Sequence, residues 1–285
     1  MDRFQLTGKV AILGIAANVI LLVLKIIVGF INRSQAMIAD AFNSAGDVFA
    51  SLMTYIGNKI SSKPKDTNHP YGHGKAEYIF SMIISFSLLL VAFRILQSSI
   101  VSIINREFFV PSFWLIMIAA LTIIVKTVLF VYTRNAGKKE NNLLILANSE
   151  DHRNDIFVTS STLISILMGL GGIYWFDGVV GIGISLWIAF TGIRIFRSSY
   201  HVLMDTNIGS KFMEDMIKTI ESIQGVDHVD TVTAKPIGVN FILIVKVSVH
   251  GSMTVNESHS IAAQIKEKLM QKNSVADVVV HINPV

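Results

Sequence analysis

The amino-acid sequence predicts a membrane domain of six transmembrane α-helices followed by a small α+β domain. Hydrophobic residues make up 52% of the chain and charged residues 15%, whereas soluble domains carry about 25% charged residues. The apolar residues gather in six long runs before residue 206, and the rest of the chain has the mixed polarity of a soluble domain. We therefore expect a six-helix transmembrane domain at residues 1–206 and a second domain at residues 207–285.

Each of the six apolar runs is long enough to cross a bilayer, because about 20 helical residues span the hydrocarbon core. Lipid offers backbone N–H and C=O groups no hydrogen-bond partner, so we expect each run to form a helix, which satisfies these groups internally. The runs comprise residues 10–31, 36–57, 78–104, 113–133, 143–172 and 179–196.

Lysine and arginine are distributed unequally between the connections that join these helices. The connections after the second and fourth runs are rich in both, and the connections on the opposite side hold only Arg33 and Arg106. Because Lys and Arg are enriched in cytoplasmic connections, we expect both termini of a multi-pass plasma-membrane protein to face the cytoplasm. The lack of a long histidine-rich loop favours a bacterial inner membrane. The basic residues of the two rich connections are Lys59, Lys63, Lys65, Lys75, Arg134, Lys138 and Lys139.

The second domain shows an alternation of helical and strand patterns. Its apolar periodicity predicts a helix, two strands, a helix and a last strand. This αββαβ order predicts an antiparallel sheet with both helices on one face. The elements are expected at residues 210–223, 228–234, 240–249, 255–271 and 275–282.

A polar stretch at residues 150–155 interrupts the fifth apolar run. Asp151 and Asp155 are four residues apart, so on a helix both carboxylates point to one side. Asn43 and Asp47 form a pair with the same spacing in the second run. Ionisable groups inside membrane helices tend to face the bundle interior or an ion path, so the two pairs could converge on one cation. The alternative is that residues 150–155 form a cytoplasmic loop and the helix begins at residue 156.

Three carboxylates and one amide oxygen are hard ligands, and the chain contains no cysteine. Such a set suits Mg²⁺, Ca²⁺ or Mn²⁺ and disfavours zinc or copper. Hydrogen bonding between helices is the alternative use of these side chains. Asp40 lies seven residues before Asp47, near the same face of the helix, where it could line an entry path or cap a helix end.

A second polar cluster falls in the connection after the second run. Asp66, His69 and His73 lie within eight residues of one another, and glycines allow the chain to bend around a bound metal. A solvent-exposed pair of histidines without a ligand role is the alternative.

Four motifs in this chain are distinctive: Asn43-Ser-Ala-Gly-Asp47, His69-Pro-Tyr-Gly-His73-Gly-Lys75-Ala-Glu77, Asp151-His-Arg-Asn-Asp155 and Val-Val-His281-Ile-Asn-Pro. They resemble the cation diffusion facilitator family, and the resemblance covers nearly the whole chain. The resemblance implies six spans and a C-terminal cytoplasmic domain of ferredoxin-like, metallochaperone-like αββαβ fold. It also implies a homodimeric exporter that exchanges a divalent cation for protons by alternating access.

The family places its transport site between the second and fifth helices, at positions that match Asn43, Asp47, Asp151 and Asp155. Zinc-transporting relatives carry a histidine there, and the pattern in this chain resembles the manganese-exporting branch instead. His152 follows Asp151 directly, and its side chain is expected to point about 100° away from Asp151 on a helix. Mn²⁺ is therefore the expected substrate, with Fe²⁺ or Zn²⁺ as the alternatives.

The resemblance also implies a cytoplasmic loop site at Asp66, His69 and His73, and an ion pair that ties the dimer together at Lys75 and Asp205.

The resemblance carries over less well to the metal sites of the C-terminal domain. Lys246 stands where the family has a zinc ligand, and an ammonium repels a cation. Asn283 stands where the family has an aspartate. We expect at most one weak site, at Asp230, His259 and His281, completed by the partner subunit.

Three carboxylates give the transport site a formal charge of about −3 when empty and about −1 with a divalent cation bound. An empty site of that charge in a low dielectric should take up protons as the metal leaves, which couples the two movements. We expect no prosthetic group, no bound nucleic acid and no enzymatic activity. An intramembrane hydrolase lacks support because no HExxH motif is present. A passive cation channel, or a membrane-anchored metal sensor without transport, would lack proton-dependent flux.

Overall fold

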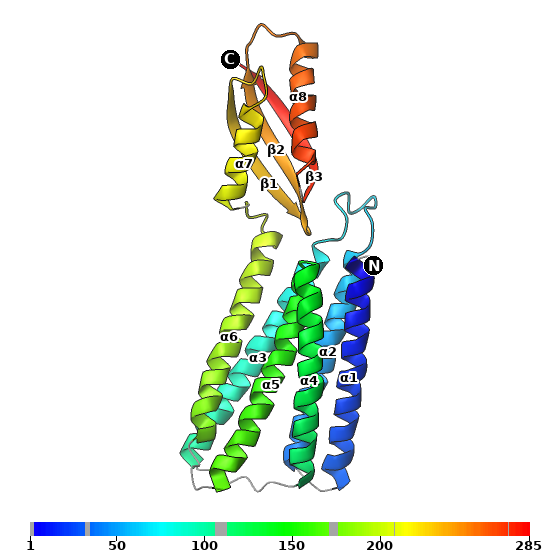
Figure 1. Cartoon of the computed structure of the whole chain (residues 1–285), viewed down its shortest axis with the longest axis vertical. Helices are drawn as coiled ribbons and strands as arrows, with labels where there is room; N and C mark the ends of the chain where they lie inside the picture. The colour runs from blue at the N-terminus through cyan, green and yellow to red at the C-terminus, as the bar shows by residue number, and fades with distance from the viewer. Residues whose placement is uncertain (1–2, 32–34, 106–112, 171–175, 208, 273) are drawn as a thin grey trace. The chain divides into compact units, whose positions relative to one another are not determined.

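The structure is a computed structural model that describes residues 3–31, 35–105, 113–170, 176–207, 209–272 and 274–285. These ranges contain eight α-helices and three β-strands (Figure 1). The chain divides into two compact units. One unit comprises Met1–Lys63 and Ala76–Ser199, and the other comprises Pro64–Lys75 and Tyr200–Val285. The boundary expected between residues 206 and 207 stays a prediction.

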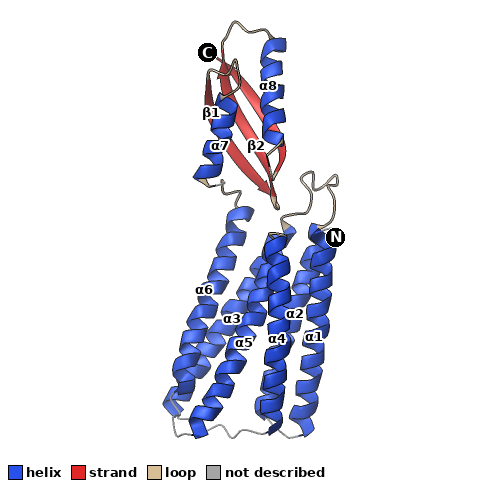
Figure 2. Cartoon of the chain, viewed as in Figure 1, coloured by secondary structure: helices blue, strands red, loops and turns tan. Residues whose placement is uncertain are grey.

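The first unit is a bundle of six long helices that lie side by side (Figure 2). Three of them contain stretches that are long and apolar enough to cross a membrane on length and composition alone: Phe4–Val28, Ala76–Val101 and Ile116–Lys139. The predicted fold class, a six-helix membrane domain with a C-terminal α+β domain, is confirmed. The helices are α1 (Arg3–Ile31), α2 (Gln35–Ser61), α3 (Ala76–Asn105), α4 (Phe113–Lys139), α5 (Leu143–Leu170) and α6 (Phe176–Leu203).

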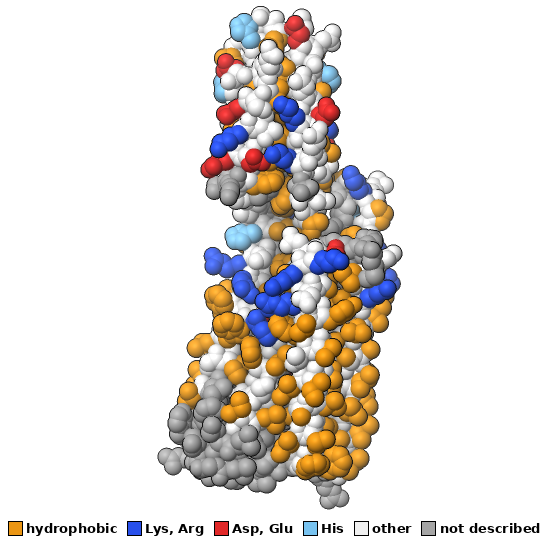
Figure 3. Space-filling model, in the orientation of Figure 1, with side chains coloured by type: hydrophobic (Ala, Val, Ile, Leu, Met, Phe, Trp, Pro, Cys, Tyr) orange, Lys and Arg blue, Asp and Glu red, His pale blue; other side chains and the backbone are white. Residues whose placement is uncertain are grey.

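The bundle exposes apolar side chains and buries polar ones, the reverse of a soluble protein. Large hydrophobic residues such as Ile20, Leu90 and Ile124 are more than half exposed, and hydrophobic side chains gather on the surface of the helical unit in Figure 3. Ser51 and Thr54 of α2 are fully buried. This distribution fits a surface that contacts hydrocarbon and an interior where helices exchange hydrogen bonds.

Helix ends differ from the predicted runs because polar residues extend a helix beyond the apolar part. α1 begins at Arg3 rather than at residue 10, and α4 continues to Lys139 rather than ending at residue 133. The whole polar stretch at residues 150–155 lies inside α5, so the alternative of a loop there is wrong. An apolar run therefore marks the membrane-embedded part of a helix rather than its full length.

Helices α2, α3, α5 and α6 share one apolar core. Polar contacts fix α1 against α2, where Asn18 Nδ2 donates to the backbone oxygen of Asp47 and to Ser51 Oγ, both at 3.1 Å. These hydrogen bonds fix the backbone of α2 near Asp47 against α1. Core residues of the four helices include Ala50, Ile84, Leu88, Leu144, Ala147 and Ile188.

The second unit contains α7 (Ser210–Glu221), β1 (His228–Ile237), β2 (Asn240–Val249), α8 (Val255–Met270) and β3 (Val275–Pro284). The sheet order is β1-β2-β3. β1 and β2 are antiparallel, but β3 runs parallel to β2, so the expectation of an antiparallel sheet is wrong for this strand. The reason is the connection: α8 returns the chain to the end where β2 began, and an adjacent strand that follows such a crossover must be parallel.

Both helices cover the same face of the sheet, as expected. Alternate residues of β2, from Leu243 to Val249, are buried together with Met216 and Ile220 of α7 and Ile265 of α8. Alternation places these β2 side chains on one face. That face forms the core of the second unit, and Lys246 lies on the opposite, open face.

Helix α8 begins with a capping box. The N-cap residue Thr254 accepts from the Glu257 backbone N–H through Oγ1 at 3.3 Å, and the Thr254 backbone N–H donates to Glu257 Oε2 at 2.8 Å. The hydrogen bonds from the Thr254 backbone and hydroxyl hold the pKa of Glu257 below its usual value. The box satisfies two backbone groups that a helix start leaves unpaired.

We predict that Thr254→Ala loosens the first turn of α8 without unfolding the domain. Loss of an N-cap side chain costs about 1 kcal/mol, so amide hydrogen exchange in this turn should accelerate about fivefold. Hydrogen–deuterium exchange of peptides that cover Val255–Met270 measures the effect. Thr231→Ala, an exposed position in β1, is the matched control, and equal exchange in the two variants would show that the box does not stabilise the helix.

Candidate metal centre

The middle of α5 carries a run of polar residues that the bundle buries. Asp151 is 8% exposed, Asn154 is 3% exposed and His152 is fully buried. The helix places Asp151 and Asp155 one turn apart on one side, as their spacing predicts. These acids therefore lie in the interior of the membrane unit.

Glu150 and Arg153 belong to the same polar run but make contacts elsewhere. Glu150 pairs with Arg134 at 3.2 Å and also with Arg153. Arg153 donates to Thr191 Oγ1 at 3.2 Å and its guanidinium lies 5.4 Å from the ring centre of Trp187. The polar run thus divides into two groups. Glu150 and Arg153 make structural contacts with α4 and α6, and Asp151 and Asp155 face the interior.

Asp47 comes to the same interior from α2 and is 6% exposed. It is close enough to Asp151 and Asp155 for the three charges to interact. The side chains of Asn43 and Asp40 fall outside the described residues, although the backbone of α2 places Asn43 one turn before Asp47. The structure therefore brings three of the four predicted ligands together.

Lys126 of α4 lies among these acids. This position was not predicted from the sequence. Its Nζ is 2.7 Å from Asp47 Oδ2 and 2.5 Å from Asp155 Oδ2, and its side chain is 1% exposed. The predicted formal charge of −3 for the empty site is therefore wrong, because one ammonium reduces it to −2. The signal was present in the sequence: Lys126 is the only charged residue in the run 113–133, and a charge inside a membrane helix marks a functional site.

His152 also lies closer to the acids than expected. Ligand atoms of Asp151, His152 and Asp155 all lie within 4.8 Å of one another. In the part of the chain that the structure describes, neither ring nitrogen of His152 has a hydrogen-bond partner, and Asp151 Oδ2 has none either. A buried polar atom without a partner is costly, so these atoms are available to a ligand. His152 therefore lies close enough to both acids to share a ligand with them, although adjacent helix positions differ by about 100° in direction.

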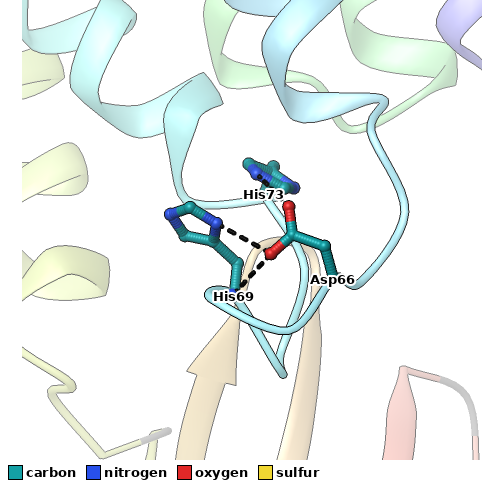
Figure 4. Close-up of side chains that lie close together, drawn as sticks. All are labelled: Asp66, His69 and His73. Atoms are coloured by element: carbon teal, nitrogen blue, oxygen red, sulfur yellow. Dashed lines mark hydrogen bonds and ion pairs between the residues drawn. The ribbon is translucent and has the colours of Figure 1, made fainter.

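A second cluster lies in the connection between α2 and α3, within the second unit (Figure 4). Asp66 Oδ1 accepts from the His69 backbone N–H at 2.7 Å, and Asp66 Oδ2 lies 3.5 Å from His73 Nε2. The His69 backbone hydrogen bond keeps the pKa of Asp66 below its usual value, so the carboxylate stays charged. His73 Nδ1 lies 3.1 Å from the Pro64 carbonyl oxygen. A proton on Nδ1 would leave the Nε2 lone pair directed at Asp66, as a metal ligand requires.

Contacts within the second unit support this loop. The turn between β1 and β2 approaches it so closely that a Cβ on Gly238 would lie 3.1 Å from Gly74 Cα, and Gly238 has a φ of +82°. The Lys235 ammonium lies 5.2 Å from the ring centre of Tyr71. The sheet thus helps to fix the loop that carries Asp66, His69 and His73.

Lys75 and Asp205 form an ion pair, with Lys75 Nζ 2.6 Å from Asp205 Oδ1. Both residues belong to the second unit. The pair is partly exposed, so alone it contributes little to stability. Its part in joining two subunits stays a prediction.

The predicted residues of the C-terminal site do not gather in one chain. Among the described residues, Asp230, His259 and His281 do not form a group of ligand atoms like the two clusters above. Asp230 instead accepts from Asn283 Nδ2 at 3.0 Å and from Ser248 Oγ at 3.1 Å. His281 is paired in register with Lys246, whose charge opposes a bound cation. A site completed by a partner subunit stays a prediction.

Both parts of the chain match domains of known cation efflux proteins. Residues 11–204 match the cation efflux transmembrane domain, and residues 209–285 match the cytoplasmic domain of cation efflux proteins. The chain is 30% identical to the manganese efflux system protein MneP of Bacillus subtilis, over 99% of this chain and 98% of the relative. It is 32% identical to MneS of the same organism, over 99% and 97%. It is 29% identical to the magnetosome protein MamM of Paramagnetospirillum magneticum, over 91% and 82%.

We predict that Gly238→Ala weakens the support of the loop at residues 64–75. A side chain at a positive φ costs about 1–2 kcal/mol, and the added Cβ has no room beside Gly74. Trypsin should therefore cleave the loop after Lys65 several times faster than in the parent, as measured by limited proteolysis and mass spectrometry. Gly209→Ala is the matched control, because nothing lies within 4 Å of its added Cβ. Parental cleavage of the Gly238→Ala protein would contradict the prediction.

Proposed function

Because the chain belongs to the cation efflux family of membrane transporters, the cation diffusion facilitators, we propose that it exports a divalent metal cation, with Mn²⁺ as its substrate. The observation that carries the proposal is the convergence of Asp47, Asp151 and Asp155 in the interior of the helical unit. Acids are rarely placed inside a membrane unless they serve an ion path.

The donor atoms support a hard divalent cation. Asp47, Asp151 and Asp155 offer carboxylate oxygens, and Asn43 stands one turn before Asp47 on α2. His152 adds an imidazole nitrogen close to Asp151 and Asp155. A set of oxygens with one nitrogen suits Mn²⁺ or Fe²⁺, which accept both kinds of ligand, better than Mg²⁺, which keeps most of its water.

The names of two relatives support manganese in particular, since MneP and MneS are both manganese efflux system proteins. Fe²⁺ and Zn²⁺ are the competing substrates for the same site.

Exchange against protons follows from the charge of the site. Three carboxylates and one ammonium carry a formal charge of −2. A divalent cation neutralises this charge, and its departure exposes carboxylates in a low dielectric, where protonation is favoured. The carboxylates lie close together, so they would titrate as a group rather than singly.

We infer the orientation from the distribution of charge. Lys59 at the end of α2 and Lys138 and Lys139 at the end of α4 lie at the helix ends that we assign to the cytoplasm. Both termini would then be cytoplasmic, in a bacterial inner membrane. Residues 207–285 would form the cytoplasmic domain through which two copies associate, with Lys75 and Asp205 as the charge interlock.

A membrane-anchored metal sensor is the second candidate, and the cluster of Asp66, His69 and His73 favours it. A sensor would bind metal at this loop without moving it across the membrane. Flux measurements separate the two functions.

We predict that Asp47→Asn and Asp155→Asn each abolish transport. Each change removes a charged ligand and leaves Lys126 with only one of its two carboxylate partners. Uptake of Mn²⁺ into inside-out proteoliposomes, with a proton gradient imposed or absent, measures the loss. Asp215→Asn, which alters an exposed acid paired with Lys272, is the control that should transport normally. Mn²⁺ uptake at the parental rate by both site variants would make the site assignment wrong, and binding without any flux in the parent would favour the sensor.

We predict that Asp151→His changes the metal preference toward zinc. The substitution exchanges a hard oxygen for an imidazole nitrogen, which Zn²⁺ favours over Mn²⁺. The ratio of Zn²⁺ to Mn²⁺ initial uptake rates should rise about tenfold or more, corresponding to about 1.4 kcal/mol of selectivity. Asp151→Glu, which keeps the carboxylate, should leave the ratio near the parental value. An unchanged ratio in the Asp151→His protein would refute the account of selectivity by ligand type.

A further inference from the structure

Lys126 is the best-buried charged group that contacts the acidic site. It lies near the middle of α4, inside the candidate span Ile116–Lys139. A lysine at this depth of a membrane is costly unless a carboxylate pairs with it. The contacts with Asp47 and Asp155 explain why the fold tolerates the lysine, but they do not explain why the site contains it.

The two oxygens that hold Lys126 come from different helices. Asp47 belongs to α2 and Asp155 to α5, so the ammonium bridges the same two helices that a bound cation would bridge. A divalent cation binds carboxylate oxygens at about 2.0–2.6 Å, which is close to the distances of 2.7 Å and 2.5 Å from Nζ to these two oxygens. A cation that bound both oxygens would therefore lie against Nζ and be repelled by it.

We propose that Lys126 is a tethered counter-cation that competes with the transported metal for Asp47 and Asp155. The inference rests on the proposed function, because it concerns the same site. When a divalent cation enters, the ammonium leaves the two oxygens, and when the cation departs, the ammonium returns to them. The flexible four-carbon stem of lysine permits this movement without any shift of α4.

Competition of this kind would serve two needs of a transporter. Three carboxylates in a low dielectric would otherwise hold a divalent cation too firmly for rapid release, and the returning ammonium offsets part of that attraction. The tether also keeps the ammonium at a high effective concentration. Na⁺ and K⁺ carry the same single charge as the ammonium but are not tethered, so they would fail to displace Lys126 from the carboxylates. A divalent cation has twice the charge and would displace it.

A purely structural role of Lys126 predicts the opposite effect of its removal on metal affinity. If Lys126 only neutralised the acids and held them in place, its removal would disorder the ligands and weaken metal binding. If it competes with the metal, its removal frees two oxygens and strengthens binding. The sign of the change in affinity therefore separates the two roles.

The test is a calorimetric titration of the full-length protein in lipid nanodiscs with Mn²⁺, at constant pH and salt. All proteins carry His69→Ala and His73→Ala, so that the loop cluster loses its imidazole ligands. In this background Lys126→Met replaces the ammonium by an unbranched side chain, and we expect the Kd for Mn²⁺ to fall at least tenfold. Lys126→Arg keeps the charge on a planar fork that pairs more firmly with carboxylates, and we expect the Kd to rise at least tenfold.

Unchanged or weaker Mn²⁺ binding by a Lys126→Met protein with a parental size-exclusion profile would overturn the proposal. If that variant does not fold, Lys126→Arg decides, because parental or tighter binding by it would equally refute competition. Asp47→Asn in the same background tests the site itself. Parental Mn²⁺ binding by Asp47→Asn would refute the proposed function, whereas loss of binding there with parental affinity in both Lys126 variants would refute only the role of Lys126.

Discussion

Hydrocarbon cannot solvate an ion, so every charge inside the helical unit needs a partner where it lies. The ammonium of Lys126 provides such a partner for two acids at once, and in doing so it joins α2, α4 and α5 at one point. Truncating one member of a buried ion pair leaves the other member uncompensated, which is strongly destabilising. The packing of the bundle and the chemistry of its interior therefore depend on the same three side chains.

Helix α5 shows how one polar run can serve two purposes. The 3.6-residue period turns Glu150 and Arg153 toward neighbours on α4 and α6, where they pair with Arg134 and Thr191. The same period turns Asp151 and Asp155 toward the interior. His152 is fully buried, and a ring nitrogen lies near Asp151 and Asp155. The contacts of Glu150 and Arg153 fix the helix. Of its two interior acids, Asp155 accepts a hydrogen bond from Lys126, whereas Asp151 Oδ2 has no partner among the described residues.

The fold was largely predictable because each membrane helix contains a long run of apolar residues that is easily identified in the sequence. Run lengths located all six helices, but they failed at the ends, since residues such as Arg3 continue a helix into water. The direction of β3 could not be read from its own pattern, because it follows from the crossover through α8. The alternation of side chains in a strand shows which face is buried, but the connection between two strands determines whether they pair parallel or antiparallel.

The site was predictable only where spacing along one helix determined it. The four-residue spacing of the acids predicted that each pair lies on one side of its helix. The contacts of Lys126 with Asp47 and Asp155 depend instead on how α2, α4 and α5 pack together. A single lysine hardly changes the hydropathy of α4, so run-length reasoning passed over it. The closeness of His152 to the acids could not be predicted from its angle on the helix, because an imidazole nitrogen lies well beyond Cβ.

The loop at Pro64–Lys75 belongs to the second unit although it lies between α2 and α3 in the chain. A ribosome makes this loop well before it makes β1 and β2, whose turn supports it through Gly74 and Gly238. Gly74 therefore meets a partner that lies more than a hundred residues later in the chain. The contact that supports the loop can thus form only after β1 and β2 have been synthesised.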